Sequence, residues 1–192
     1  MLNHQGTRII ETERLILRPF TMADTEPMFR NWANDPDVCR YMTWPPHENE
    51  EVTRELLTRW TGSYGAPDYY NWANVLKDNG PEPIGNISTA HVTESTLCAT
   101  MGYCMSKAHW GRGIMAEALC AIVDFFFGQV GFNRIDADHD IENPNSGRVM
   151  QKAGMQFEGT MRQAGRNNRG IVDICHWAIL RQDWLENRQN RN

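Results

Sequence analysis

The chain has 192 residues, the size of one domain, and it is 41% hydrophobic and 22% charged, which is typical of a globular protein and unlike a disordered one. A net charge of −5 argues against a protein that binds nucleic acid by neutralising phosphates. No apolar run reaches the roughly 18 residues of a membrane span, and the first residues do not read as a secretory signal, so we expect a cytoplasmic protein.

Apolar periodicity and turn signals predict a mixed chain of strands and helices. The turn sequence Asp78-Asn79-Gly80-Pro81 predicts a hairpin, and Gly154 suits the C-cap of a helix. The expected elements, in order, are a strand at 14–19, a helix that carries Met28 and Trp32, a helix at 48–60, strands at 71–76, 84–88 and 97–105, a helix at 116–127, a strand at 134–141, a helix at 146–153, and strands at 156–162 and 172–180. The fold class is α/β with many antiparallel hairpins, because the regular βαβ alternation of a doubly wound sheet is missing.

A turn with two glycines, residues 110–116, joins an expected strand to the best predicted helix. Gly111 and Gly113 let the main chain curl so that successive N–H groups point into one concavity, and the following helix adds its positive N-terminal end. Such a turn can cradle a diphosphate. It is not a Walker A loop and lacks dinucleotide-binding spacing. The alternative is an ordinary tight turn whose glycines serve only steric needs.

A second candidate segment begins at Asp140. Asn143 follows a strand and Ser146 stands at the mouth of a helix, an arrangement that alone predicts a turn and an N-cap. The two segments, in this order, resemble the GNAT superfamily of acyl-CoA-dependent N-acetyltransferases. Further likeness to the branch of ribosomal-protein N-terminal (alanine) acetyltransferases lies in residues 12–19, 34–38 and 44–47, and in Gly159, Arg162, Gly170 and Asp173.

The resemblance covers one domain, residues 8–185, with residues 1–7 and 186–192 as flexible termini. It implies the GNAT fold, an α/β (α+β) architecture whose mixed, mostly antiparallel central sheet is splayed at the acyl-CoA site and flanked by helices. It also implies acetyl-CoA as the cosubstrate, and no metal is expected. The implied cofactor-binding residues are Tyr103, Cys104, Met105, Trp110, Gly111, Arg112, Gly113, Ile114, Met115, Ala116, Asn143 and Ser146.

The resemblance also assigns roles in the reaction, which would be direct attack of a primary amine on the thioester. Main-chain N–H groups near Cys104 and Met105 would stabilise the oxyanion, and Ser146 would protonate the leaving thiolate. The base is left open, with water relayed to Glu142, or to Glu158 or Asp140, as options. Cys104 as an acyl-carrying nucleophile is disfavoured, because no activating base stands beside it in the sequence.

The acceptor is expected to be a peptide N-terminus or a small-molecule amine. Trp44, Tyr70 and Asp138 are candidate substrate-binding residues, because aromatic rings and an acidic strand suit a cationic group. The competing hypothesis is a CoA-binding sensor or interaction domain without turnover. Met150 and Gly165 motivate it, since they stand where some relatives carry a tyrosine acid and a glutamate base. We expect neither nucleic acid nor membrane as a partner, and a homodimer is left open.

Overall fold

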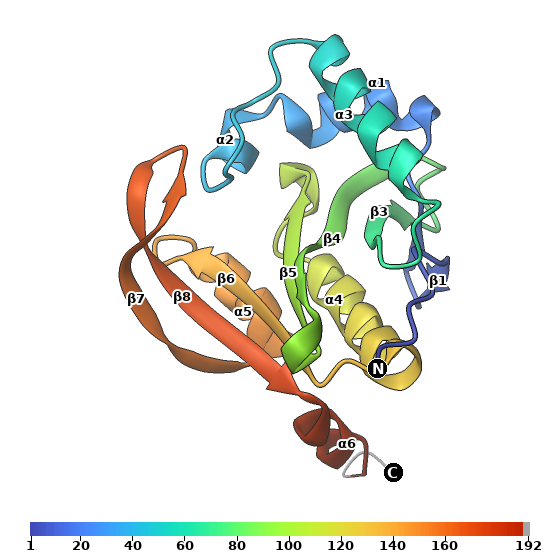
Figure 1. Cartoon of the computed structure of the whole chain (residues 1–192). Coiled ribbons are helices and arrows are strands. Elements are labelled where there is room, and N and C mark those ends of the chain that lie inside the picture. The colour runs from blue at the N-terminus through green and yellow to red at the C-terminus, as the bar shows by residue number, and fades with distance from the viewer. Residues whose placement is uncertain (190–192) are drawn as a thin grey trace.

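The computed structural model describes residues 1–189, which form one eight-stranded sheet flanked by helices (Figure 1). The strand order is β1-β2-β3-β4-β5-β6-β8-β7, and within the described residues each neighbouring pair is antiparallel except β5–β6. The strands are β1 (Ile10–Glu11), β2 (Leu15–Arg18), β3 (Asn71–Leu76), β4 (Pro83–Thr93), β5 (Cys98–Met105), β6 (Arg134–Asp140), β7 (Gln156–Asn167) and β8 (Gly170–Leu180). This sheet is the mixed, mostly antiparallel sheet that the resemblance implies.

Helices cover both faces of the sheet (Figure 1). They are α1 (Thr25–Met28), α2 (Pro36–Cys39), α3 (Glu50–Ser63), α4 (Ile114–Phe125), α5 (Pro144–Lys152) and α6 (Arg181–Gln189), with short 3-10 or π-helical turns η1 (Met22–Asp24), η2 (Phe29–Ala33), η3 (Glu94–Thr96), η4 (Lys107–His109) and η5 (Phe126–Val130). The larger hydrophobic core lies between the sheet and α4, and a smaller one lies under α1–α3. None of the helices within residues 1–189 is long and apolar enough to cross a membrane.

The predicted elements are all present, and the differences lie at their ends. Helix α5 begins at Pro144, two residues earlier than predicted, because proline is well suited to the first turn of a helix. Strand β7 extends to Asn167, well past its predicted end. The patterns in the sequence do not predict β1, α2 or α6. Helix α6 has no buried residue and therefore lacks the apolar stripe that would reveal it.

Residues 1–7, which the sequence analysis sets apart as a flexible terminus, pack onto the domain. Leu2 is buried, and the N–H of Asn3 donates to the carbonyl of Val130 over 2.8 Å. The N–H of Gly6 donates to the carbonyl of Pro67 over 2.7 Å. The apolar side chain of Leu2 gives this segment a reason to join the core. At the other end, α6 runs to Gln189, and the rest of the second predicted terminus, residues 190–192, lies outside the described residues.

Tyr70 belongs to the core and not to a substrate-binding wall. Its side chain is fully buried, stacked on Trp72 with the ring centroids 5.8 Å apart and set edge-on to Phe126 at 4.9 Å. Its hydroxyl reaches the N-terminal segment, where it contacts His4. The prediction that Tyr70 contacts the acceptor is therefore wrong, because its ring fills the space between the sheet and α4.

Candidate active site

The sheet forks between β5 and β6. These strands pair from Cys98 with Arg134 to Met101 with Ala137, and the pairing stops there. Strand β5 continues to Met105 and stays paired with β4 on its other side. The last residues of β5 therefore present one main-chain edge that no strand covers, which is the edge an extended ligand can pair with.

A cleft of about 550 Å³ lies at the fork, between the end of β5, the glycine turn, the start of α5 and α2. Arg112 is the one predicted cofactor-binding residue that does not line it, because its side chain is exposed and only its carbonyl is engaged, by Arg14. Glu142, a candidate base, also lines the cleft. The predicted cofactor-binding residues that line it are Tyr103, Cys104, Met105, Trp110, Gly111, Gly113, Ile114, Met115, Ala116, Asn143 and Ser146.

The glycine turn is built to receive an anion. Gly111 and Gly113 have φ values of 76° and 75°, in the left-handed region that favours glycine, and Gly113 is the N-cap of α4. Within the described residues, the N–H groups of Gly111, Arg112 and Gly113 donate to no protein atom. The indole N–H of Trp110 donates to the carbonyl of Met105 over 2.7 Å and so fixes the turn to the end of β5. These free donors and the helix N-terminus fit a diphosphate.

The first turn of α5 forms the opposite wall of the cleft. Asn143 is the N-cap, and its side-chain amide lies 3.5 Å from the hydroxyl of Ser146 without capping the helix. Ser146 lies in the first turn and not at the N-cap where the sequence placed it. Tyr103 on β5 reaches across and donates its hydroxyl to the carbonyl of Ser146 over 3.0 Å. Burial raises the pKa of Tyr103, so this phenol stays protonated and remains a donor.

Cys104 is a structural thiol and not a nucleophile. Its side chain is buried and donates to Oδ1 of Asn86 over 2.9 Å. Burial raises the pKa of the thiol to about 12, and the thiolate is the reactive form. This thiol therefore stays protonated at neutral pH.

Of the three candidate bases, Glu142 is the one that lines the cleft. Burial acts to raise the pKa of Asp140, but hydrogen bonds from the N–H of Glu142 and from Asn167 and Arg169 outweigh it and lower that pKa. Asp140 therefore stays ionised and holds the tip of the β7–β8 hairpin. Glu158 is hydrogen-bonded to Arg134, which lowers its pKa, and it lies in the polar cluster described next.

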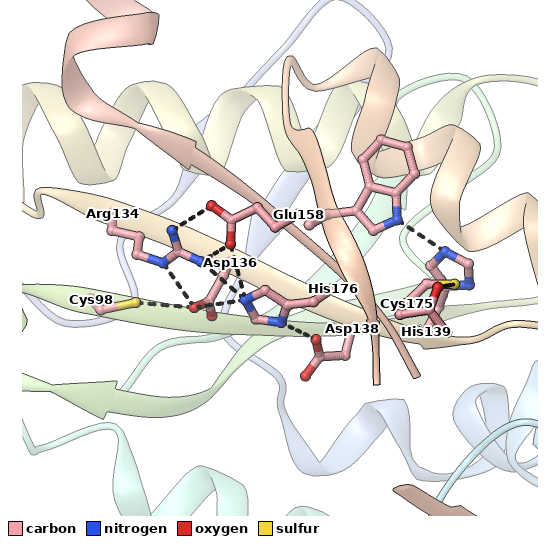
Figure 2. Close-up of polar contacts among 10 residues, drawn as sticks. Cys98, Arg134, Asp136, Asp138, His139, Glu158, Cys175 and His176 are labelled. Atoms are coloured by element: carbon pink, nitrogen blue, oxygen red, sulfur yellow. Dashed lines mark hydrogen bonds and ion pairs between the residues drawn. The ribbon is translucent and has the colours of Figure 1, made fainter. Parts of the chain in front are cut away.

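Figure 2 shows this cluster, in which Asp138 contacts His176 and Arg134 lies against both His176 and Glu158. The cluster lies on the face of the sheet opposite α4, because Ile135 and Ala137 fill the α4 side of the alternating strand. Arg134 can only donate, so Nε2 of His176, 3.0 Å away, accepts and the ring proton sits on Nδ1 against Asp138.

Asp138 is the first residue of β6 beyond the fork, and it does not line the cleft. Its side chain is 40% exposed. Its Oδ1 contacts Nδ1 of His176. The sequence analysis missed His176, because only the register of β6 against β8 places it beside Asp138. Within residues 1–189 no group of three or more metal-ligating side chains is arranged to hold an ion.

The segment after α2 and the tip of the β7–β8 hairpin are joined by Asn168. Its amide donates to the carbonyls of Cys39 and Trp44, and its N–H donates to the carbonyl of Met42. Trp44 packs against the smaller core and does not line the cleft. The sequence analysis missed a further set of cleft-lining residues, which are Asp37, Val38, Arg40, Tyr41, Met42, Lys107, Pro144, Asn145, Arg148, Val149 and Lys152.

Comparison with known proteins gives a consistent result. The model of the family described as "Acetyltransferase (GNAT) domain" matches residues 14–156. The probable N-acetyltransferase YjcK of Bacillus subtilis is 38% identical over 179 residues, covering 91% of this chain and 98% of that protein. The ribosomal-protein-serine acetyltransferase of Escherichia coli is 26% identical over 140 residues, covering 72% and 76%. A GNAT-family acetyltransferase structure from Bacillus anthracis superposes with a TM-score of 0.80 at 26% identity, covering 91% and 99%.

Proposed function

The chain belongs to the GNAT family of acetyl-CoA-dependent N-acetyltransferases, and we propose that it acetylates a peptide N-terminal α-amine or a small-molecule amine by direct attack. Acetyl-CoA supplies the acetyl group as an activated thioester. One observation carries the proposal: a single cleft at the fork is lined by the free edge of β5, by the glycine turn and by the first turn of α5. The residues present therefore fit each part of the cosubstrate.

Three sets of residues in the cleft would bind different parts of acetyl-CoA. The unpartnered N–H groups of the turn and the N-terminus of α4 would hold the pyrophosphate. The open edge of Tyr103–Met105 would pair with the pantetheine arm as an extra strand would. Asn143 lines the cleft, and its side-chain amide would bond the same arm.

The chemical step needs an oxyanion donor and a proton for the leaving thiolate. The main-chain N–H of Met105 lies on the edge of β5 that no strand covers, where it would stabilise the oxyanion, whereas the N–H of Cys104 faces β4. Ser146 lines the cleft, and its hydroxyl, which accepts from the amide of Asn143 over 3.5 Å and does not cap the helix, would protonate the thiolate. The base is left unassigned: Glu142 lines the cleft, but its carboxylate is ion-paired with Arg169 over 2.6 Å.

The acceptor would approach from the face that carries Asp138. This carboxylate stands one residue beyond the fork with one oxygen bonded to His176, and its exposed side chain suits an ammonium group. No residue of the cleft is assigned as a base for the amine. The favoured acceptor is therefore the one with the larger neutral fraction at the working pH. A peptide α-amino group has a pKa near 8 and is partly neutral at pH 7 to 8, whereas a lysine side chain near 10 is not.

The pH profile of kcat/KM over a panel of peptide and small-molecule amines tests this proposal. A rise that follows each acceptor's own pKa supports selection of the free amine. A break near pH 6 to 7 that chemically different acceptors share would reveal an enzyme base and contradict it. α-Amines should be preferred to lysine-like amines of similar size.

A second candidate function is a CoA-binding sensor or interaction domain without turnover. It is favoured by Met150, a buried thioether that cannot donate a proton, and by Gly165, where a Cβ would collide with Ile174 and no glutamate would fit without movement. Isothermal titration with acetyl-CoA followed by a thiol-release assay over the amine panel separates the two. Binding without turnover on any amine favours the sensor.

A further inference from the structure

Helix α2 covers the same face of the sheet as Asp138. Its Val38 packs in the smaller core with Cys104 of β5, whereas Met105, the next residue of β5, packs in the larger core with α4. Successive residues of a strand point to opposite faces, so α2 lies on the face opposite α4. Asp138 stands on that face beside the fork. The wall that α2 gives to the cleft is therefore on the side from which the acceptor would approach.

Arg40, the C-cap of α2, lines this wall and has no acidic partner. Its guanidinium donates no hydrogen bond and forms no ion pair within residues 1–189. Asp37, on the same short helix, is bonded to Lys107, and this bond, more than the charge of Arg40, lowers the pKa of Asp37. Glu142, the other acid that lines the cleft, is paired with Arg169 over 2.6 Å. Both acids are thus neutralised, and the charge of Arg40 is left for a ligand.

The contacts around Arg40 hold this part of the wall in place. Its guanidinium lies 5.5 Å from the ring centroid of Tyr41, and that of Arg169 lies 5.8 Å from the same centroid. Arg169 is itself fixed by Asp140, to which it donates over 3.0 Å. At the tip of the β7–β8 hairpin, the amide of Asn168 bonds two carbonyls of the segment that carries Tyr41 (Figure 1). A ligand that meets so ordered a wall has little side-chain freedom to suppress on binding.

We infer that Arg40 binds a carboxylate of the acceptor, so that the acceptor is an amine that also carries an acid group. This inference rests on the proposed function, because it takes the cleft at the fork as the place where acceptor and cosubstrate meet. Arginine presents parallel N–H donors to the two oxygens of a carboxylate, which gives the contact both direction and strength. With Asp138 on the same face for an ammonium group, both charges of such an acceptor meet opposite charges on the protein.

Acceptor pairs that differ only in a carboxylate test this inference. The first set consists of C-terminally amidated tetrapeptides of alanine with a free α-amine, in which the second, third or fourth position is glutamate or glutamine. The second set is γ-aminobutyrate and its amide, which separates a small-molecule source of the acid from a peptide source. In at least one pair the acid should have a kcat/KM about five- to tenfold larger than its amide. This preference should shrink at high salt, because the charges of the cleft are partly exposed to solvent.

Three variants locate the preference at Arg40. Arg40→Gln should bring the ratio of acid to amide close to one, and Arg40→Lys should keep part of it, because the charge stays while the paired donors are lost. Arg59→Gln is the matched control and should keep the full ratio. Arg59, on α3, is exposed, forms no ion pair in the described part of the chain and does not line the cleft. The affinity of Arg40→Gln for acetyl-CoA, measured by titration calorimetry, should stay within about twofold of the unchanged protein.

Calorimetric titration of the CoA-saturated protein with the same acceptors gives a measurement that needs no turnover. Equal kcat/KM for acid and amide in every pair, or a preference that Arg40→Gln retains, overturns the inference and leaves the proposed function standing. A large loss of acetyl-CoA affinity in Arg40→Gln assigns this arginine to the cosubstrate and also overturns it. Tighter binding of the acids without turnover supports the inference and contradicts the proposed function. Neither binding nor turnover of any acceptor contradicts both.

Discussion

Tyr103 and Ser146 are joined across the fork by one hydrogen bond, from the phenol hydroxyl on β5 to a main-chain carbonyl on α5, 3.0 Å away. Both residues line the cleft, so this bond holds its two walls at a set separation. The bond is partly buried, and it is the one side-chain hydrogen bond that the phenol of Tyr103 forms within the described residues.

Removing that hydroxyl should destabilise the protein. We expect Tyr103→Phe to lower the free energy of unfolding by about 1 kcal/mol, the usual net contribution of one hydrogen bond. Urea denaturation measures it. Tyr41→Phe is the matched control, since the hydroxyl of Tyr41 forms no bond within residues 1–189, and its loss should stay below about 0.5 kcal/mol. Equal losses in the two variants would contradict the role of this bond.

Gly113→Asp should abolish the binding of acetyl-CoA. A Cβ at Gly113 would lie 3.8 Å from Nη2 of Arg14, and the added negative charge at the turn would repel a diphosphate. The φ of 75° adds a strain of about 1–2 kcal/mol for any side chain. Gly80→Asp separates strain from charge, because Gly80 has a φ of 77° in a hairpin away from the cleft. That variant should lose stability and bind acetyl-CoA normally, as titration calorimetry would show.

Ser146→Ala should slow the chemical step more than it weakens binding. If the hydroxyl protonates the thiolate, kcat falls about tenfold or more while the KM for acetyl-CoA stays within about twofold. Steady-state kinetics at saturating acceptor separate the two constants. Because Asn143 and not Ser146 is the N-cap, little change in the melting temperature is expected. A change confined to the melting temperature would show that the serine is structural.

Cys104→Ala should keep turnover. The thiol has a pKa of about 12 and forms a hydrogen bond to Asn86, so it carries no acyl group during the reaction. We expect kcat within about threefold of the unchanged enzyme and a stability loss of about 1 kcal/mol from the unpaired amide oxygen. Mass spectrometry after incubation with acetyl-CoA alone should find no acetyl group on this residue. An acetylated Cys104, or a loss of turnover on substitution, would indicate a covalent acyl-enzyme intermediate at this residue.

Asp140→Asn should destabilise the protein in a pH-dependent way. The pKa of Asp140 is lowered in the folded state, so its ionised form contributes stability above the unfolded value of about 3.9. That contribution is lost as the pH falls through the folded pKa. The difference in unfolding free energy between the unchanged protein and Asp140→Asn should therefore be largest near pH 7 and shrink below pH 4. A difference that is constant from pH 7 to pH 3 would show that the charge of Asp140 is not involved.

The features of the site that could be predicted from the sequence are formed by residues that lie close together in the chain. The glycine turn and the start of α5 each place several groups within one short segment, so their local conformation determines what they offer. Strand β3 was predicted with its observed ends, because a short segment rich in apolar residues lies between turn signals on both sides. Met115 lines the cleft because it lies in the first turn of the helix that follows the glycine turn.

What sequence could not predict depends on the pairing of distant segments. Asp138 meets His176 only through the register of β6 with β8. Tyr41 reaches the cleft because α2, a single turn, is held by the hairpin tip through Asn168. Tyr70 was misplaced for the same reason, since a ring next to a loop in sequence can still turn into the core.

The fork between Met101 and Ala137 also bears on what binding costs the protein. Within the described sheet β5 and β6 are the one parallel pair, and α4 rather than a tight turn connects them. Their ends can part without distorting a hairpin, and the gap exists before any ligand arrives. An incoming extended ligand therefore breaks no strand-to-strand hydrogen bond, and little of its interaction free energy is spent on rearranging the sheet.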